Sequence, residues 1–416
     1  MKQIEKDIVV IGAGPAGLAA ALEARKQGAE KVLILERDTE MGGILQQCIH
    51  DGFGLHRFQA RLSGGQYAQR FIDELKSTDI EVKLDTIVLQ MTSDKIVYAC
   101  NQQDGMMEIH AGTVILAMGC RERTASQVFI YGTRPAGVMT AGTVQRYINM
   151  EGYLPGKNAV ILGSGDIGLI MARRMTLEGI QVKGVYEVMP SPGGLTRNIV
   201  QCLEDYNIPL HLSTTVVRTY GKQRLEGITV AKVDENRKPI PGTEEYIPCD
   251  LLVLAVGLIP ENELSRQAGV LMDPKTKGPV VDDTFMTSIP GVFACGNVSV
   301  VFDLVDYVSQ SGEIAARGAV QYLKHGIPDQ IEYIPVEVGE NVNFVVPQRL
   351  RRLPHNAPVT FFMRVKHVQE KVELRCVCGE KLAKKNRYVV VAPPEMLECS
   401  VDLTADDHPR FEVVEV

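Results

Sequence analysis

The sequence lacks several features that mark specialised classes of protein. Its 416 residues contain no run of about 18 apolar residues, which a helix needs to cross a membrane. Lys and Arg do not outnumber Asp and Glu, and the net charge of −7 with a pI near 5.7 argues against nucleic acid or an anionic membrane as a partner. There is no tryptophan and no low-complexity segment. We expect a globular protein of roughly two or three domains.

Cysteine pairs with the spacing of redox motifs are also missing near the nucleotide motifs. The nine cysteines are odd in number and scattered, which favours reduced thiols over a disulfide framework. Neither C-x-x-C nor C-x-x-x-x-C occurs near the nucleotide motifs described below, so a dithiol relay is not expected. Cys376 and Cys378, with the distant Cys399, fall short of four ligands for an iron-sulfur or zinc site. We interpret them as strand thiols and predict no metal site.

No targeting signal is expected at the beginning of the chain. An apolar strand starts within a few residues of Met1, so neither a signal peptide nor a spanning helix is expected. We therefore expect a cytoplasmic protein.

A glycine-rich turn is the first positive signal. Gly12, Gly14 and Gly17 form G-x-G-x-x-G between an apolar strand and an expected helix. The first glycine permits the tight turn, the second lets a pyrophosphate approach the backbone, and the third lets the helix pack closely on the strand. The helix N-terminus stabilises the anion, and Glu36 is placed to accept hydrogen bonds from ribose hydroxyls. The candidate binding residues here are Gly12, Gly14, Pro15, Ala16, Gly17, Glu36 and Arg37.

A glycine pair follows soon after Glu36. Gly42 and Gly43 stand in the segment ERDTEMGG. Paired glycines allow the backbone to pass close to a second nucleotide segment, as expected when the dinucleotide is FAD rather than NAD. An ordinary turn is the alternative.

The same arrangement recurs 151 residues later, in AVILGSGDIG at 159–168. In both copies an acid, Glu36 or Glu187, lies 24 residues after the first glycine, so we predict two βαβ units with parallel sheets. A carboxylate at Glu187 repels a 2′-phosphate, and the nearest following arginine is Arg197, which favours NAD over NADP. A degenerate, empty site is the alternative. The candidate residues of this second turn are Gly163, Gly165, Asp166, Ile167, Gly168 and Glu187.

Other apolar strands also come in pairs. TVILAMG at 113–119 and DLLVLAVG at 250–257 each follow one βαβ unit, and GVFACGNV at 291–298 precedes an expected helix at 306–324. This order indicates that the chain returns to complete the first domain after the second has been inserted. The candidate residues at these strand ends are Ala117, Gly119, Gly257, Gly296, Asn297 and Tyr307.

We predict an α/β fold with two Rossmann-like dinucleotide-binding domains and a small β-rich C-terminal domain. Residues 1–140 and 283–328 form a discontinuous FAD-binding domain, 141–282 an inserted NAD-binding domain, and 329–416 a domain for association. Alternating patterns predict the strands of the last part at 343–346, 359–365, 371–377 and 387–391.

These motifs carry a family resemblance over about residues 5–325. VILAMG and VLAVG resemble the paired strands of two-dinucleotide-binding-domain flavoproteins related to glutathione and thioredoxin reductases, and VFACGNV resembles their A-x-G-D motif. The resemblance implies FAD and NAD(H) as cofactors. Asn297 stands where that family has an Asp that hydrogen-bonds the FAD ribityl chain, and an Asn still accepts through its amide oxygen. Tyr307, near the start of the next helix, is expected beside the flavin pyrimidine.

A second resemblance concerns the assembly. Five segments together resemble the bacterial oxidoreductases found beside a flavin-dependent glycerol-3-phosphate dehydrogenase and a short partner protein. They are more distantly similar to FAD subunits of proline dehydrogenases, opine oxidases and hydrogen cyanide synthase. This implies a heteromeric complex with such a flavoprotein and short protein, and a homo-oligomer is also open. The segments are CIHDGFG (48–54), GCRERT (119–124), GTRPAGVMTAG (132–142), GSGDIGLIMARRMTLEG (163–179) and PGGLTRNIVQCLED (192–205).

Cys48 and His50 fall where the chain runs beside the isoalloxazine ring. His50 is a candidate to position a ligand and Cys48 to form a transient adduct, with structural hydrogen bonding as the alternative. We predict an FAD-dependent oxidoreductase that moves electrons between NAD(H), flavin and a partner or small acceptor. Two alternatives stay open. One is an FAD subunit of an amine or amino-acid (proline or opine) dehydrogenase with a structural second site, and the other is a non-catalytic FAD-binding assembly subunit.

Overall fold

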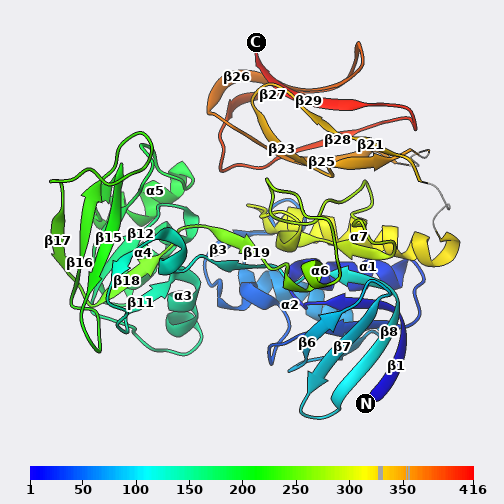
Figure 1. Ribbon diagram of the computed structural model, residues 1–416, viewed down its shortest axis with the longest axis horizontal. Helices are drawn as coiled ribbons and strands as arrows, with labels where there is room; N and C mark the ends of the chain where they lie inside the picture. Colours follow the sequence, from blue (N-terminus) through cyan, green and yellow to red (C-terminus); the bar gives the residue numbers. More distant parts are fainter. Residues whose placement is uncertain (327–330, 353, 355–356) are drawn as a thin grey trace. The chain divides into compact units, whose positions relative to one another are not determined.

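The computed structural model describes residues 1–326, 331–352, 354 and 357–416 (Figure 1). These residues form two compact units. The three-domain division predicted above, with boundaries at 140/141, 282/283 and 328/329, stays a prediction, and the last boundary lies outside the described residues. The first unit comprises Met1–Gln46, Asp51–Cys120 and Pro260–Val416, and the second comprises Gln47–His50 and Arg121–Ile259.

A seven-stranded sheet forms the centre of the first unit, in the order β5-β2-β1-β8-β7-β6, with β20 also paired to β8. The strands β5, β2, β1, β8 and β20 are parallel, whereas β7 and β6 form an antiparallel meander on β8. All four residues of strand β2 (VLIL) are apolar and buried, as expected for a strand that is covered on both faces of a parallel sheet. Helices α1 and α7 pack against each other. The bounds are β1 Lys2–Ile11, α1 Pro15–Lys26, β2 Val32–Leu35, η1 Gly43–Gln47, β3 Asp51–Phe53, β4 Leu62–Ser63, α2 Gly64–Lys76, β5 Glu81–Lys83, β6 Ile87–Met91, β7 Ile96–Asn101, β8 Gly105–Leu116, α6 Glu263–Gln267, β20 Val292–Ala294, η4 Gly296–Val298 and α7 Val305–His325.

The C-terminal part of the first unit is a β-sandwich, drawn in orange to red (Figure 1). One sheet has the order β22-β29-β26-β27 and the other β23-β25-β28, with β21 and β24 paired beside them. The predicted α/β class and strand-rich C-terminal region are thus confirmed. The bounds are β21 Tyr333–Pro335, β22 Glu337–Val338, β23 Val342–Val346, β24 Arg349–Arg351, β25 Val359–Val365, β26 Gln369–Cys378, β27 Lys381–Val391, β28 Leu397–Val401 and β29 Pro409–Glu415.

The sandwich packs on the segment that leads into α7. Phe362 of β25 lies edge-on to Phe302 with ring centroids 5.1 Å apart, and is 5.5 Å from the ring of Tyr307. Arg364 donates to the carbonyl oxygen of Val301 at 3.1 Å. The aromatic contacts bury large apolar rings, so Phe362 joins the core that contains the start of α7, while most of the rest of the sandwich has a hydrophobic core of its own.

An ion-pair cluster in the sandwich yields a pH prediction. The Glu373 carboxylate accepts hydrogen bonds from Arg375 at 2.8 Å and Arg387 at 3.0 Å, which hold its pKa to about 2, well below its ordinary value. Because the folded-state pKa is depressed, this stabilisation is present above the ordinary pKa and is lost as the pH falls towards 2. We expect Glu373→Gln to lower the unfolding temperature at pH 7, with a difference from wild type that shrinks between pH 4.5 and pH 2 in calorimetry. Glu370→Gln, an exposed acid of the same strand, is the control, and an equal effect of both variants would contradict the prediction.

The second unit contains a five-stranded parallel sheet, in the order β11-β18-β12-β13-β14, and a four-stranded sheet, in the order β10-β15-β16-β17. The central strand β12 (NAVIL) is buried over its last four residues. No helix in the described parts of either unit carries the apolar length that a bilayer crossing requires. The bounds are β9 Cys120–Glu122, η2 Ala125–Val128, β10 Tyr131–Gly132, β11 Val138–Thr140, α3 Ala141–Asn149, β12 Asn158–Leu162, α4 Asp166–Leu177, β13 Gln181–Tyr186, α5 Thr196–Cys202, η3 Glu204–Tyr206, β14 Leu210–His211, β15 Thr214–Tyr220, β16 Gly227–Lys232, β17 Glu245–Pro248, β18 Leu251–Leu254 and β19 Leu258–Pro260.

Candidate functional sites

The first glycine turn lies between β1 and α1, at the carboxyl end of the sheet. Gly12 has φ of +106°, and a Cβ there would lie 2.5 Å from the carbonyl oxygen of Ala117, so only glycine fits. At Gly17 a Cβ would overlap the carbonyl of Gly12, which confirms the expected close contact between helix and strand. Gly14 differs, because nothing lies within 4 Å of where its Cβ would stand. The turn is therefore closed on the protein side and open where the motif places a pyrophosphate.

The N-terminal end of helix α1 is suited to bind an anion. Gly14 is the N-cap, no side chain of the described residues caps it, and the first turn (Pro15, Ala16, Gly17) contains no acid. The backbone N–H groups at such an end carry partial positive charge. The residues present thus fit a dinucleotide phosphate.

Glu36 fixes the conformation of the turn through buried hydrogen bonds. Its carboxylate is buried and accepts hydrogen bonds from the backbone N–H of Ala13 at 2.7 Å and of Asp38 at 2.9 Å. Each oxygen keeps a further lone pair, so a ribose hydroxyl is still compatible with this position. Arg37, which follows, is exposed.

The second turn reproduces this frame bond for bond. Gly163 has φ of +103°, nothing lies within 4 Å of a Cβ on Gly165, and Gly168 meets the carbonyl of Gly163. Glu187 accepts from the backbone N–H of Ser164 at 2.9 Å and of Met189 at 2.9 Å. The internal repeat seen in the sequence is therefore also a repeat of hydrogen bonds. In each copy, backbone bonds also join the acid to the segment at the end of the neighbouring strand. These bonds run from Glu36 N–H to Lys83, from Thr86 N–H to Glu36, from Glu187 N–H to His211 and from Thr214 N–H to Glu187.

The two turns differ at the first residue of the helix. Where the first copy has Pro15, the second has Asp166, whose predicted contact with the cofactor stays a prediction. Its Oδ1 accepts from the backbone N–H of Leu195 at 2.9 Å and from the side chain of Asn198 at 2.7 Å. In the structure Asp166 holds the loop before α5, and Ile167 beside it is half-buried.

The second copy also has a glycine pair facing its turn, Gly193 and Gly194, which lies in the segment PGGLTRNIVQCLED quoted above but was not among the candidate binding residues. Gly42 donates to the carbonyl of Ala13, and a Cβ on Gly43 would lie 3.1 Å from the Cα of Gly14. Gly193 likewise donates to Ser164 Oγ at 2.9 Å, and its Cβ would lie 3.9 Å from the Cα of Gly165. Gly42 and Gly193 each stand 30 residues after the first glycine of their copy, and that equal spacing was the available signal. Both glycine turns are therefore faced by a glycine pair.

The remaining predicted contacts lie at strand ends. Ala117 and Gly119 follow β8, and Gly257 follows β18 in the second unit. Asn297 accepts from the Phe302 N–H at 3.0 Å and donates to Cys120 Sγ at 3.5 Å, so its amide already holds the loop before α7. Gly296 is buried at the start of the same loop.

Tyr307 is half-buried, and Cys48 is buried with its thiol 3.9 Å from Gln145 Oε1. Burial raises the pKa of Tyr307 to about 12, and its ring contacts Phe362 of the sandwich. Burial also raises the pKa of Cys48 to about 12, which leaves little thiolate at neutral pH and weighs against the adduct role. His50, two residues on, is half-buried.

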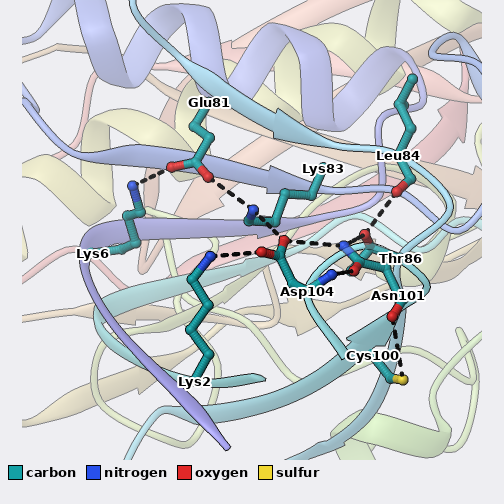
Figure 2. Close-up of polar contacts among 9 residues, drawn as sticks. All are labelled: Lys2, Lys6, Glu81, Lys83, Leu84, Thr86, Cys100, Asn101 and Asp104. Atoms are coloured by element: carbon teal, nitrogen blue, oxygen red, sulfur yellow. Dashed lines mark hydrogen bonds and ion pairs between the residues drawn. The ribbon is translucent and has the colours of Figure 1, made fainter. Parts of the chain in front are cut away.

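A polar cluster braces the far side of the first site (Figure 2). Asp104, in the turn between β7 and β8, accepts from Lys2 at 2.6 Å and from Lys83 at 2.7 Å, and these contacts lower its pKa. Asn101 donates to Thr86 Oγ1 at 3.0 Å. The meander turn is thus tied to the strand ends that also hold Glu36.

Comparisons with known proteins agree with this geometry. The chain is 26% identical over 284 residues to the HcnB subunit of the hydrogen cyanide synthase of Pseudomonas aeruginosa, covering 63% of this chain and 59% of that protein. It is 26% identical over 339 residues to one of the subunits of the opine oxidase of Agrobacterium tumefaciens, covering 76% and 66%. The chain thus spans about three-fifths of the length of the first of these relatives.

Solved structures show the same fold. The thioredoxin reductase of T. acidophilum superposes with a TM-score of 0.61 at 24% identity, covering 76% of this chain and 98% of that one. Residues 6–316 match the family model described as pyridine nucleotide-disulphide oxidoreductase, which is most of the chain and includes both glycine turns. The protein therefore belongs to the pyridine nucleotide-disulphide oxidoreductase family of FAD- and NAD(P)-binding oxidoreductases.

Proposed function

We propose that this FAD-dependent oxidoreductase holds FAD at the first glycine turn and takes up NAD(H) at the second, passing electrons to a partner protein or small acceptor. The observation that supports this most strongly is the duplicated frame, in which Gly14 and Gly165 both stand at an open helix end that no side chain of the described residues caps. Bound FAD supplies the redox chemistry by exchanging a hydride with the nicotinamide. The chain supplies position and charge.

The roles of the protein groups follow from their positions. The N-terminal N–H groups of α1 and α4 would bind the pyrophosphates, and Glu36 and Glu187 would orient the adenosine riboses. The remaining proposed contacts on the FAD side are Gly42, Gly43, Gly119, Gly296, Asn297 and Tyr307. Because dipoles at helix ends are fixed in place, they need no reorganisation when the charged ligand binds.

NAD(H) is proposed over NADP(H) for the second site. The loop after β13 reads Val188, Met189, Pro190 and carries no cation, whereas a 2′-phosphate calls for Arg or Lys beside the ribose. Glu187 adds a buried negative charge at that place.

Assembly into a heteromeric complex in the cytoplasm is the second part of the proposal. The relatives above are named as subunits, of hydrogen cyanide synthase and of opine oxidase. The partners we propose are a glycerol-3-phosphate-dehydrogenase-like flavoprotein and a short protein, on the sequence resemblance. A role within an amine or amino-acid dehydrogenase is the second candidate, because opine oxidase is among the relatives.

Anaerobic rapid mixing tests the proposal. We expect NADH to bleach the visible flavin absorption of the purified chain within seconds, and NADPH to do so roughly tenfold more slowly or not at all. A flavin that NADH does not reduce, but that proline or an opine reduces when the complex is reconstituted, would favour the second candidate, whereas reduction by glycerol 3-phosphate would support the proposed flavoprotein partner. A flavin inert to all of them would indicate an assembly role.

A further inference from the structure

Strand β27 (Lys381–Val391) stands at the edge of the sheet β22-β29-β26-β27. It pairs with β26 on one side, and no strand in the part of the chain that the structure describes pairs with its other side. The free side of an edge strand is a row of backbone N–H and C=O groups, which can pair with another chain. With 11 residues β27 is about twice as long as an ordinary strand, so this edge needs either protection or a partner.

The first part of β27 carries the features by which proteins protect a sheet edge. Its four cations, Lys381, Lys384, Lys385 and Arg387, are all exposed. The register with β26 also shifts within this part, as in a β-bulge. Charged side chains and bulges both oppose the approach of another strand.

The last four residues, Tyr388–Val391, carry neither feature. Val389 is 85% exposed, more than any other large apolar side chain of the described residues, and Val390 is 46% exposed. The preceding cation, Arg387, is already engaged, because it donates to Glu373 at 3.0 Å. The apolar end of this edge is therefore the part that can accept a further strand.

The distribution of charge decides which strand fits. A second copy of β27 lying parallel and in register would place each cation beside its own counterpart, which is destabilising. An antiparallel copy centred on Val389 avoids this, because residues 387–391 of the two copies then pair and the lysines lie beyond the paired segment, at opposite ends. Pro393 and Pro394 follow the strand and cannot donate a backbone hydrogen bond, so they limit the segment at its other end.

The side chains also match in this antiparallel register. Val389 of one protomer lies opposite Val389 of its partner, and Tyr388 lies opposite Val390 of its partner. Because the pair is centred on a residue, opposed side chains lie on the same face of the joined sheet. A pair of an aromatic and a β-branched residue is a favourable cross-strand contact. The apolar end of β27 is thus complementary to itself.

We propose that two copies of this chain associate through β27, with residues 387–391 pairing antiparallel about a twofold axis at Val389. The two four-stranded sheets then become one continuous sheet of eight strands. Each copy pairs the free backbone groups of the other along this segment and covers its exposed valines. The association role expected of the C-terminal part is thereby assigned to one edge of one sheet. The proposal goes beyond the proposed function and does not depend on it.

Sedimentation of the FAD-loaded chain tests the proposal. Between about 1 and about 100 μM, we expect the mass of wild type to rise from 45.8 kDa towards twice that value. Val389→Lys places two ammonium groups opposite each other at the centre of the pair, so it should raise the Kd of the dimer roughly tenfold or more. Because Val389 is exposed, the variant should keep the flavin content and circular dichroism of wild type.

Val416→Lys is the matched control. Val416 is 67% exposed, and its N–H bonds the carbonyl oxygen of Lys371 in β26 at 3.0 Å, so β26 separates it from the free side of β27. The same change of valine to lysine at this position should leave dimerisation as it is in wild type.

Cysteine crosslinking tests the register. Val389→Cys brings its thiol beside that of its partner, so mild oxidation with diamide should give a dimer that dithiothreitol separates on a gel. Leu382→Cys lies on the same strand and is also exposed, at 48%. It stands seven residues from the centre, so its two thiols would lie roughly 45 Å apart and no dimer should form. Wild type under the same treatment gives the background from the nine native cysteines.

Three outcomes would contradict the proposal. One is a wild type that stays monomeric over the whole range of concentration, and another is a Val389→Lys variant that dimerises normally. A reducible dimer from Leu382→Cys but not from Val389→Cys would also contradict it, because the register would be different. If wild type alone is a monomer and Val389→Lys only prevents the binding of a different protein, the edge takes a foreign strand and the second copy is the wrong occupant.

Discussion

Gly14→Val is expected to yield a folded protein that purifies without its yellow colour. Nothing in the protein lies within 4 Å of the new Cβ, and the backbone of Gly14 (φ −73°, ψ −177°) is accessible to valine. The fold should therefore tolerate the side chain at a cost of about 1 kcal/mol for the altered N-cap. The pyrophosphate of FAD should bind far more weakly, because the valine side chain occupies its path to the helix end.

The measurement is the ratio of visible flavin absorption to protein after reconstitution with excess FAD. We expect occupancy to fall by roughly tenfold or more, since even a partial clash exceeds the ~1.4 kcal/mol that corresponds to a factor of ten. Far-ultraviolet circular dichroism should match wild type. A fully loaded yellow variant would show that the first turn does not bind the phosphate.

Gly165→Val should give the complementary result, a yellow protein that NADH no longer reduces. Gly165 has the same open space and a similar backbone conformation (φ −64°, ψ 163°), so the fold again accepts the side chain. The proposed FAD site is in the other copy, so FAD should stay bound. The second-order rate of flavin reduction by NADH should fall by roughly a hundredfold, because the phosphate can no longer reach the end of α4.

Chemical reduction separates loss of binding from loss of redox competence. Dithionite should bleach the Gly165→Val flavin as fast as that of wild type. The two valine variants serve as controls for each other, because each fills one copy of the same turn. Rapid reduction of Gly165→Val by NADH would mean that the nicotinamide nucleotide binds elsewhere.

Much of the fold was accessible from the sequence because both nucleotide units are local. The turn, helix and acid of each copy lie within 24 residues, and the pattern of G-x-G-x-x-G after an apolar strand is stereochemically demanding. The helix expected at 306–324 is observed at Val305–His325, and the strand expected at 359–365 at Val359–Val365. Apolar periodicity was sufficient for these elements.

The parts that were missed depend on contacts between distant segments. Met189 and Arg237 line one cavity although their positions in the sequence differ by 48. The contact of Phe362 with Tyr307 likewise has no sequence signal beyond hydrophobicity. The structural role of Asp166 was not foreseeable from its motif, because its partners lie at the start of a separate helix, α5, at 195 and 198.

The order in which the segments of the chain join the central sheet has a consequence for biosynthesis. The central sheet of the first unit receives β20 and the covering helix α7 only after residue 290, so the last residues of β8 have an unpaired parallel edge until then. The second unit is nearly continuous, from Arg121 to Ile259, and can complete its own core on the ribosome first. A nascent chain stalled before β20 would expose that edge and invite aggregation. Late folding of the half that carries the first glycine turn also means that FAD capture at the proposed site must wait until β20 and α7 have been synthesised.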